Sequence, residues 1–289
     1  MPNFFIKNSQ IKDDRIEIIG ELSKHLRDSL RIKKGERIVC IDEEKNKYNV
    51  IITYVGKEMI TGTIIEKSSH IKTHDVTINL VQAIPKGPKF DYIIQKSTEL
   101  GVSAITPVIS ERCVVRPEKE QAQAKLLRWR RIALEAAQQS NRRDVPEIKT
   151  PVTFTEFLSL YENPPPLNHL PQGEGRLEGI PSIPPPLMGG GEGEGDQRGF
   201  SGDKGDLNIL LWEGEKEKEK GIKELLRNAS GIKSVAVVIG PEGGFSENEV
   251  KIAVEKGFTS VSLGESILRT ETAPIVILSI VTYEFGYLG

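Results

Sequence analysis

The sequence has 289 residues, enough for two modest domains with a buried core. Its 39 basic and 41 acidic residues nearly balance, so the total charge does not select a partner. No apolar run is long enough to span a bilayer, and the N-terminus lacks the features of a secretory signal. Two cysteines, Cys40 and Cys113, and four histidines exclude a disulfide framework and give no support to a metal site. We therefore expect a cytoplasmic protein that binds neither membrane nor metal.

The first 72 residues are rich in short β-branched runs. Arg37–Asp42, Tyr48–Tyr54 and Met59–Glu66 are separated by polar or glycine-containing turns, which is typical of strands. Before them, Gly20–Arg31 carries leucines at helical spacing. Strands joined by turns, with one helix, predict a small β-barrel over residues 1–72.

From residue 73 onward, strands alternate with helices. The expected strands are Val76–Val81, Ile105–Ile109, Val235–Ile239 and Thr259–Leu263, and the expected helices are Phe90–Gly101, Glu118–Ser140 and Ala273–Val281. This alternation predicts an α/β domain over residues 73–289, with a mainly parallel sheet and helices on both faces.

The segment Asn163–Asp206 fits neither pattern. It holds 8 of the 17 prolines and 11 of the 27 glycines, and its 3 basic and 7 acidic residues give a net charge of −4. Such a composition does not bury enough apolar surface to offset the entropy of ordering the chain. We interpret 163–206 as a disordered insertion within the α/β domain.

The strand Val235–Ile239 runs into a glycine-rich loop, Gly240–Gly244. Ser246 and Glu249 then supply a capping box for a following helix. An ordinary strand-to-helix turn needs one glycine, whereas three glycines with proline and glutamate between them favour a ligand-binding loop. The loop lacks the Gly-Lys-Ser/Thr of a P-loop and the spacing of a dinucleotide fingerprint.

A second polar loop, Leu263–Thr272, joins the last expected strand to the apolar helix from Ala273. Glu271 lies near the N-terminus of that helix, where a carboxylate is favourable. Taken alone, Arg269 and Glu271 fit a surface ion pair that caps the helix as well as they fit a functional pair.

Together the two motifs, GPEGGF at 240–245 and LGESILRTETA at 263–273, resemble those of the RsmE family. This family comprises 16S ribosomal RNA uridine N3-methyltransferases of the knotted SPOUT superfamily. The resemblance continues in KSTELGV at 96–102 and in the helix around Arg128, and it covers the chain except the insertion. Asn3 stands where the family usually has an arginine.

The resemblance implies an RNA-binding, PUA-like β-barrel followed by an α/β SPOUT domain with a C-terminal trefoil knot, assembled as a homodimer. It also implies that three loops of the knotted region form a crevice for S-adenosyl-L-methionine. The residues mapped to this crevice are Leu211, Trp212, Gly240, Pro241, Glu242, Gly243, Gly244, Leu263, Ile267 and Leu268.

Methyl transfer to N3 of uracil requires loss of the imide proton and stabilisation of the developing anion. Arg269 is permanently cationic and presents several donors, so it suits the stabilising role. Glu271 would orient Arg269 or accept the proton, and we predict both residues to be catalytic. Glu242 is a competing candidate for the base, and helix capping explains Glu271 nearly as well.

The stretch from Arg112 to Lys149 holds ten basic and five acidic residues. By composition alone such a stripe is a solvated helix face, and the family resemblance reverses this preference. The residues predicted to contact 16S ribosomal RNA or the small ribosomal subunit are Arg31, Lys86, Arg112, Arg128, Arg131 and Arg142.

Two other functions stay open at this point. A different knotted methyltransferase would act on a transfer RNA or a ribose 2′-hydroxyl, and the combination of motifs favours the uridine N3 enzyme over it. A non-catalytic RNA-binding or ribosome-assembly factor is the second alternative, and the intact cofactor loops argue against it.

Overall fold

A computed structural model describes residues 2–69, 76–116, 119–161, 206–214, 220–229 and 231–286. Among them, two compact units separate: one is formed by the chain up to Thr73 together with Glu135–Val145, and the other by the remainder. Apart from Asp206, the predicted insertion at 163–206 lies outside the described residues.

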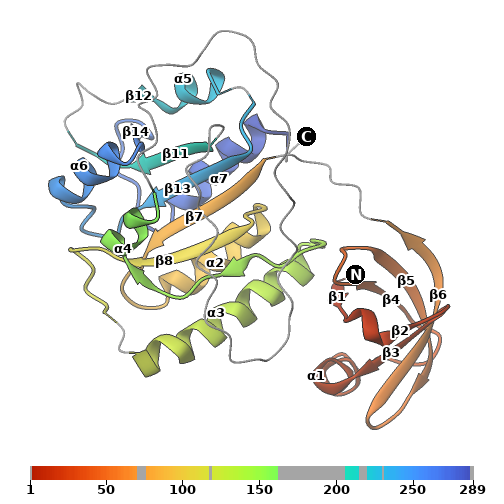
Figure 1. Ribbon diagram of the computed structural model, residues 1–289. Coiled ribbons are helices and arrows are strands. Elements are labelled where there is room, and N and C mark those ends of the chain that lie inside the picture. Colours follow the sequence, from red (N-terminus) through yellow and green to blue (C-terminus); the bar gives the residue numbers. More distant parts are fainter. Residues whose placement is uncertain are drawn as a thin grey trace. The chain divides into compact units, whose positions relative to one another are not determined.

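The first unit is a six-stranded sheet in the order β1-β4-β5-β6-β3-β2 (Figure 1). Its strands are Asn3–Phe5 (β1), Ile11–Lys12 (β2), Arg15–Ile19 (β3), Arg37–Ile41 (β4), Lys47–Val55 (β5) and Met59–Ser68 (β6). β1 pairs with β4 in parallel, and the other pairings are antiparallel. No pairing among the described residues joins β1 to β2, so the sheet is open where the sequence predicted a barrel. Both edge strands are only two or three residues long, too short to close a ring.

Alternating side chains of this sheet form the core of the first unit. Ile16, Ile18, Cys40, Val50 and Ile60 are fully buried, as period-two alternation requires of a sheet with one covered face. Burial raises the pKa of the Cys40 thiol to about 12, so this cysteine packs as a small apolar side chain.

The helix predicted over Gly20–Arg31 divides into two parts. A short α1 (Gly20–Lys24) is followed by a π-helical turn, η2 (His25–Ser29). The fully buried Leu26 anchors the turn to the core. The segment ends at Arg31, which adopts a left-handed φ of 52° and so cannot continue a helix.

The second unit is a parallel eight-stranded sheet in the order β10-β8-β7-β13-β11-β14-β12, with β9 also paired to β8. Its strands are Thr77–Ala83 (β7), Ala104–Ile109 (β8), Glu147–Ile148 (β9), Val152–Thr153 (β10), Asp206–Leu211 (β11), Lys220–Gly221 (β12), Ser234–Ile239 (β13) and Thr259–Ser262 (β14). All pairings in it are parallel. The predicted parallel sheet is confirmed, and its four predicted strands agree within two residues.

Helices cover both faces of this sheet (Figure 1). They are Lys89–Glu99 (α2), Lys119–Gln139 (α3), Phe154–Ser159 (α4), Ile222–Arg227 (α5), Glu247–Glu255 (α6) and Ala273–Glu284 (α7). On one face, α4 and α6 pack on an aromatic cluster that contains Phe157 and Phe245. On the other, α2 packs against α7. None of the described helices is long and apolar enough to cross a membrane.

The chain order places four loops at one edge of the sheet. Because β7, β11, β13 and β14 are parallel neighbours, their carboxyl ends at Ala83, Leu211, Ile239 and Ser262 lie on the same side. Open parallel sheets bind ligands at this edge. The loops at 84–88, 212–214, 240–244 and 263–272 therefore meet there.

Candidate active site

A cavity of about 580 Å³ opens where these loops meet. Its walls come from 211–213, 239–245, 261–263 and 266–270, together with Lys89, Arg112 and Ala273. All ten residues predicted to hold the cofactor line it, as does Arg269, whereas Glu271 does not. Their roles in binding and catalysis stay a prediction.

The glycines of the loop after β13 are required by its geometry. A Cβ on Gly240 would lie 3.2 Å from backbone atoms of Gly244, closer than ordinary contact, so the loop folds back tightly on itself. Gly244 adopts a left-handed φ of 66°, which suits glycine. Phe245 then anchors the loop, because it is buried and stacks on Phe154 with ring centroids 4.5 Å apart.

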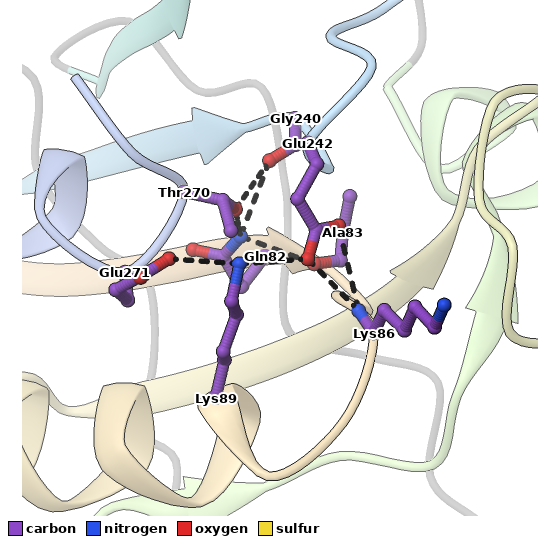
Figure 2. Close-up of polar contacts among 8 residues, drawn as sticks. All are labelled: Gln82, Ala83, Lys86, Lys89, Gly240, Glu242, Thr270 and Glu271. Atoms are coloured by element: carbon purple, nitrogen blue, oxygen red, sulfur yellow. Dashed lines mark hydrogen bonds and ion pairs between the residues drawn. The ribbon is translucent and has the colours of Figure 1, made fainter.

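One set of hydrogen bonds ties this loop to the end of β7 and to the C-terminal loop (Figure 2). The Thr270 hydroxyl donates to the Gly240 carbonyl at 2.8 Å, and the buried Gln82 amide donates to the Thr270 hydroxyl at 3.2 Å. The same amide lies 3.5 Å from the Gly240 carbonyl. Gln82 and Thr270 thereby fix the distance between two walls of the cavity.

A second set of contacts is centred on Lys89, the first residue of α2 (Figure 2). Its Nζ lies 3.0 Å from Glu242 Oε1 and 3.3 Å from Glu271 Oε2. The backbone N–H of Lys86 also donates to Glu242 Oε1 at 3.1 Å. The Glu271 contact is an attraction between charges, because Glu271 Oε2 is buried and has no hydrogen-bond partner of good geometry among the described residues.

These contacts set the charge of Glu242. Burial acts to raise the pKa of its carboxyl, but hydrogen bonds from its own and the Lys86 backbone N–H groups and from Lys89 outweigh this and lower the pKa. The hydrogen bond to Glu242 raises the pKa of Lys89 in turn. The lowered pKa and the hydrogen bonds that Glu242 already accepts make its carboxylate a weak general base.

The structure separates the two residues predicted to be catalytic. Arg269 is exposed at the cavity wall, and its guanidinium has no polar partner among the described residues. Glu271 forms its ion pair with Lys89 and not with Arg269. α7 begins at Ala273, with Thr272 as its N-cap and no acidic residue in its first turn, so the capping role considered for Glu271 is wrong.

The residues predicted to contact RNA lie in different settings. Arg112 donates to the Gly243 carbonyl at 3.0 Å and lines the cavity. Arg128 is exposed and pairs with Asp91. Lys86 and Arg131, in the second unit, and Arg31, in the first, are exposed. Arg142 is the least available, because its side chain is only 12% exposed and its Nη2 lies 2.8 Å from Asp144 Oδ1.

Sequence reasoning did not select Gln82, Lys89 or Thr270. Gln82 ends an apolar strand and Lys89 follows it within a Pro-Lys-Gly-Pro-Lys turn. Polar residues that directly follow a buried parallel strand are expected at the ligand-binding edge. That signal was available in the sequence for both residues.

Comparison with known proteins agrees with this geometry. The RNA methyltransferase domain family matches residues 72–181 and 200–282, and the RNA methyltransferase PUA domain family matches residues 18–65. Ribosomal RNA small subunit methyltransferase E of Aquifex aeolicus is 33% identical, over 90% of each chain. The chain belongs to the ribosomal RNA small subunit methyltransferase E family. The Bacillus subtilis member is 29% identical over 98% of this chain and 97% of its own.

A solved structure of this family resembles the whole chain. The Neisseria gonorrhoeae methyltransferase E, bound to S-adenosyl methionine, is 27% identical with a TM-score of 0.72, covering 98% of this chain and 97% of that one. The predicted family, the PUA-like unit and the methyltransferase class are thus confirmed.

Replacing Lys89 with Met is expected to raise the pKa of the Glu242 carboxyl, because a hydrogen bond and a positive charge are lost. Lys86→Ala is the control and leaves that pKa unchanged, since Lys86 acts through its backbone N–H. The Glu242 pKa of both variants is measured from the chemical shift of its carboxyl carbon during a pH titration. A carboxyl whose pKa is lower in the folded than in the unfolded protein stabilises the fold at pH values above the unfolded pKa. This stabilisation disappears as the pH falls through the folded pKa. The same Glu242 pKa in Lys89→Met as in the wild type would contradict the assignment.

Proposed function

We propose that the protein transfers a methyl group from S-adenosyl-L-methionine to N3 of a uridine in 16S ribosomal RNA of the small ribosomal subunit. The observation that carries this proposal is the cavity at 211–213, 240–244 and 263–268, whose lining contains every residue mapped to the cofactor. Family membership and the cofactor bound to the Neisseria gonorrhoeae relative support it.

The cavity suits this cofactor chemically. Leu211, Leu263 and Leu268 supply apolar walls, and the backbone of the loop Gly240–Gly244 supplies hydrogen-bonding groups without Cβ atoms at its glycines. S-adenosylmethionine, when bound, supplies an electrophilic methyl group. The chain's task is to hold the uracil in line with that group and to exclude water from it.

Of the three cations that line the cavity, Arg269 is free to act on the base, because Arg112 donates to the Gly243 carbonyl. Lys89 is occupied by two carboxylates, whereas the Arg269 guanidinium has no partner within the described parts of the chain. A planar donor group aimed at a uracil carbonyl stabilises the negative charge that develops as N3 loses its proton. We assign this role to Arg269.

Of the two carboxylates, Glu271 is the better proton acceptor. Glu242 already accepts hydrogen bonds from the Lys86 N–H and from Lys89, while Glu271 Oε2 accepts none of good geometry in the described structure. Glu271 does not line the cavity, so in this proposal the proton reaches it through a water molecule.

The finer architecture belongs to the same proposal. We assign residues 1–72 to an RNA-binding PUA-like domain and 73–289 to a SPOUT domain, in which the chain after β14 forms a trefoil knot. Two features support the knot: β11 lies between β13 and β14, and α7 returns to pack against α2. We also propose a cytoplasmic homodimer, supported by the exposed Tyr283 and the half-buried Ile275, Val276 and Ile280 on α7.

Mass mapping of 16S ribosomal RNA nucleosides tests the reaction directly. Cells that lack the protein should lose one 3-methyluridine, and the purified protein with S-adenosylmethionine should restore it on RNA from those cells. A methyl group on a ribose or on transfer RNA would support a different knotted methyltransferase. Cofactor binding without any methylated RNA would support a non-catalytic ribosome-assembly factor.

Arg269→Ala should lower the single-turnover rate at saturating RNA and cofactor by roughly a hundredfold, because one donor to the developing anion is lost. RNA affinity should change little. The matched control is Arg131→Ala, which should weaken RNA binding and its salt dependence at an unchanged saturated rate. Arg269→Lys separates charge from geometry, since it keeps the charge and loses the planar fork. A wild-type rate in Arg269→Ala would remove Arg269 from the chemistry.

A further inference from the structure

A second cavity, of about 390 Å³, lies beside the candidate active site. Residues of the turn after β7 and the start of α2 line it, together with Val115 and part of α3. No lining residue is common to the two cavities, but near neighbours in the sequence line each of them. Lys89 lines the first and the adjacent Pro88 the second, while Arg112 lines the first and Val115 the second. The two cavities therefore lie close together.

The floor of this second cavity is apolar and rigid. Phe90 and Trp129 are only 2% and 3% exposed, and their rings pack with centroids 4.5 Å apart. Exposed Pro88 and half-buried Val115 form an apolar rim above them. These surfaces offer packing for one face of a flat ring.

Charged groups stand around this rim. Lys125 and Arg128 come from α3, and Asp91 comes from the first turn of α2. Arg128 is 67% exposed and pairs with Asp91, which is 22% exposed. Two cations against one carboxylate leave a net positive mouth, which favours a phosphate. The carboxylate accepts hydrogen bonds only, so it selects a group that carries N–H donors.

We propose that this second cavity binds a nucleotide that flanks the methylated uridine. The inference rests on the proposed function, since it takes the target uracil to occupy the first cavity. RNA-reading proteins commonly splay out neighbouring single-stranded bases and hold each against side chains. Here the base packs on Pro88 and Val115 and donates an N–H to Asp91. Its phosphate lies against Lys125 and Arg128.

The cavity's size and charge favour an RNA nucleotide over an apolar occupant. About 390 Å³ falls within the range of small-molecule sites. An apolar peptide side chain would offer nothing to the Lys125 ammonium at the rim, whereas a phosphate would. A free nucleotide carries the same chemistry as a nucleotide within RNA, so the experiment must distinguish the two sources.

The test is a double-mutant cycle between protein and RNA. The probe is 16S ribosomal RNA ligated to carry one abasic position beside the methylated uridine, and the readout is binding affinity to the full-length protein. For the wild type, one flanking abasic position should weaken binding roughly tenfold, the loss of one base contact. In Asp91→Leu, which removes both acceptor oxygens, that same position should have a clearly smaller effect, because only the packing on Pro88 and Val115 is left to lose. Lys125→Met should weaken binding to the intact and abasic RNAs equally.

The control variant is Lys251→Met, which removes an exposed cation on α6 outside both cavities. It should keep the full tenfold abasic effect. Additive losses for Asp91→Leu at every flanking position would overturn the inference, even if the wild type methylates its target. Tight binding of adenosine or guanosine monophosphate alone, with additive RNA effects, would assign the cavity to a free nucleotide. Failure of the wild type to methylate, with the coupling intact, would contradict only the proposed reaction.

Discussion

The candidate site depends on the hydrogen bonds that hold Gly240 to Thr270 and Gln82. Gly240 directly follows β13, Thr270 belongs to the loop after β14, and Gln82 belongs to β7. These segments are far apart in the sequence, and parallel pairing alone brings only their strands together. The polar contacts then set the position of the loops themselves. Because the Thr270 hydroxyl is buried, its loss would leave the Gly240 carbonyl with a weaker contact, 3.5 Å from the Gln82 amide, at a cost of about 1–3 kcal/mol.

The charged side chains near these hydrogen bonds fall into two groups, those that are paired with an opposite charge and one that is not. Lys89 pairs with both Glu242 and Glu271 and thereby joins α2 to the same two loops. Arg269 stands at the wall without a partner in the described residues. An ammonium held between carboxylates is a structural cation, whereas an unpaired guanidinium at a cavity is available to a substrate. We therefore propose that the paired groups build the cavity and that Arg269 acts in it.

Much of this arrangement could be predicted from the sequence. Apolar runs such as Val235–Ile239 predicted the central strands, because strands buried on both faces leave a continuous signal. The motifs GPEGGF and LGESILRTETA identified two of the loops, and the family resemblance predicted that both loops line one cofactor site. Short elements were missed: α4 has only six residues, although Thr153 and Glu156 form a capping box at its start.

The partners of individual side chains could not be predicted. Arg269 and Glu271 are two residues apart, and this spacing suggested a pair. In the fold, Lys89 competes for Glu271, and that contact joins residues more than 180 positions apart. The absence of pairing between β1 and β2 among the described residues has a related origin, since the lengths of these edge strands are set by tertiary pairing. The Glu271 contact and the ends of this sheet both depend on pairing between residues far apart in the sequence, which local sequence patterns do not predict.

The most direct test of this account is calorimetric titration of S-adenosylmethionine into Thr270→Val. This change keeps the shape of the side chain and removes the hydroxyl that joins Gly240 to Gln82. Thr272→Val is the control, because the Thr272 side chain makes no capping hydrogen bond. The account predicts a roughly tenfold loss of cofactor affinity in Thr270→Val, from the lost hydrogen bond between the two loops, and wild-type affinity in the control. Wild-type affinity in a folded Thr270→Val protein would contradict it.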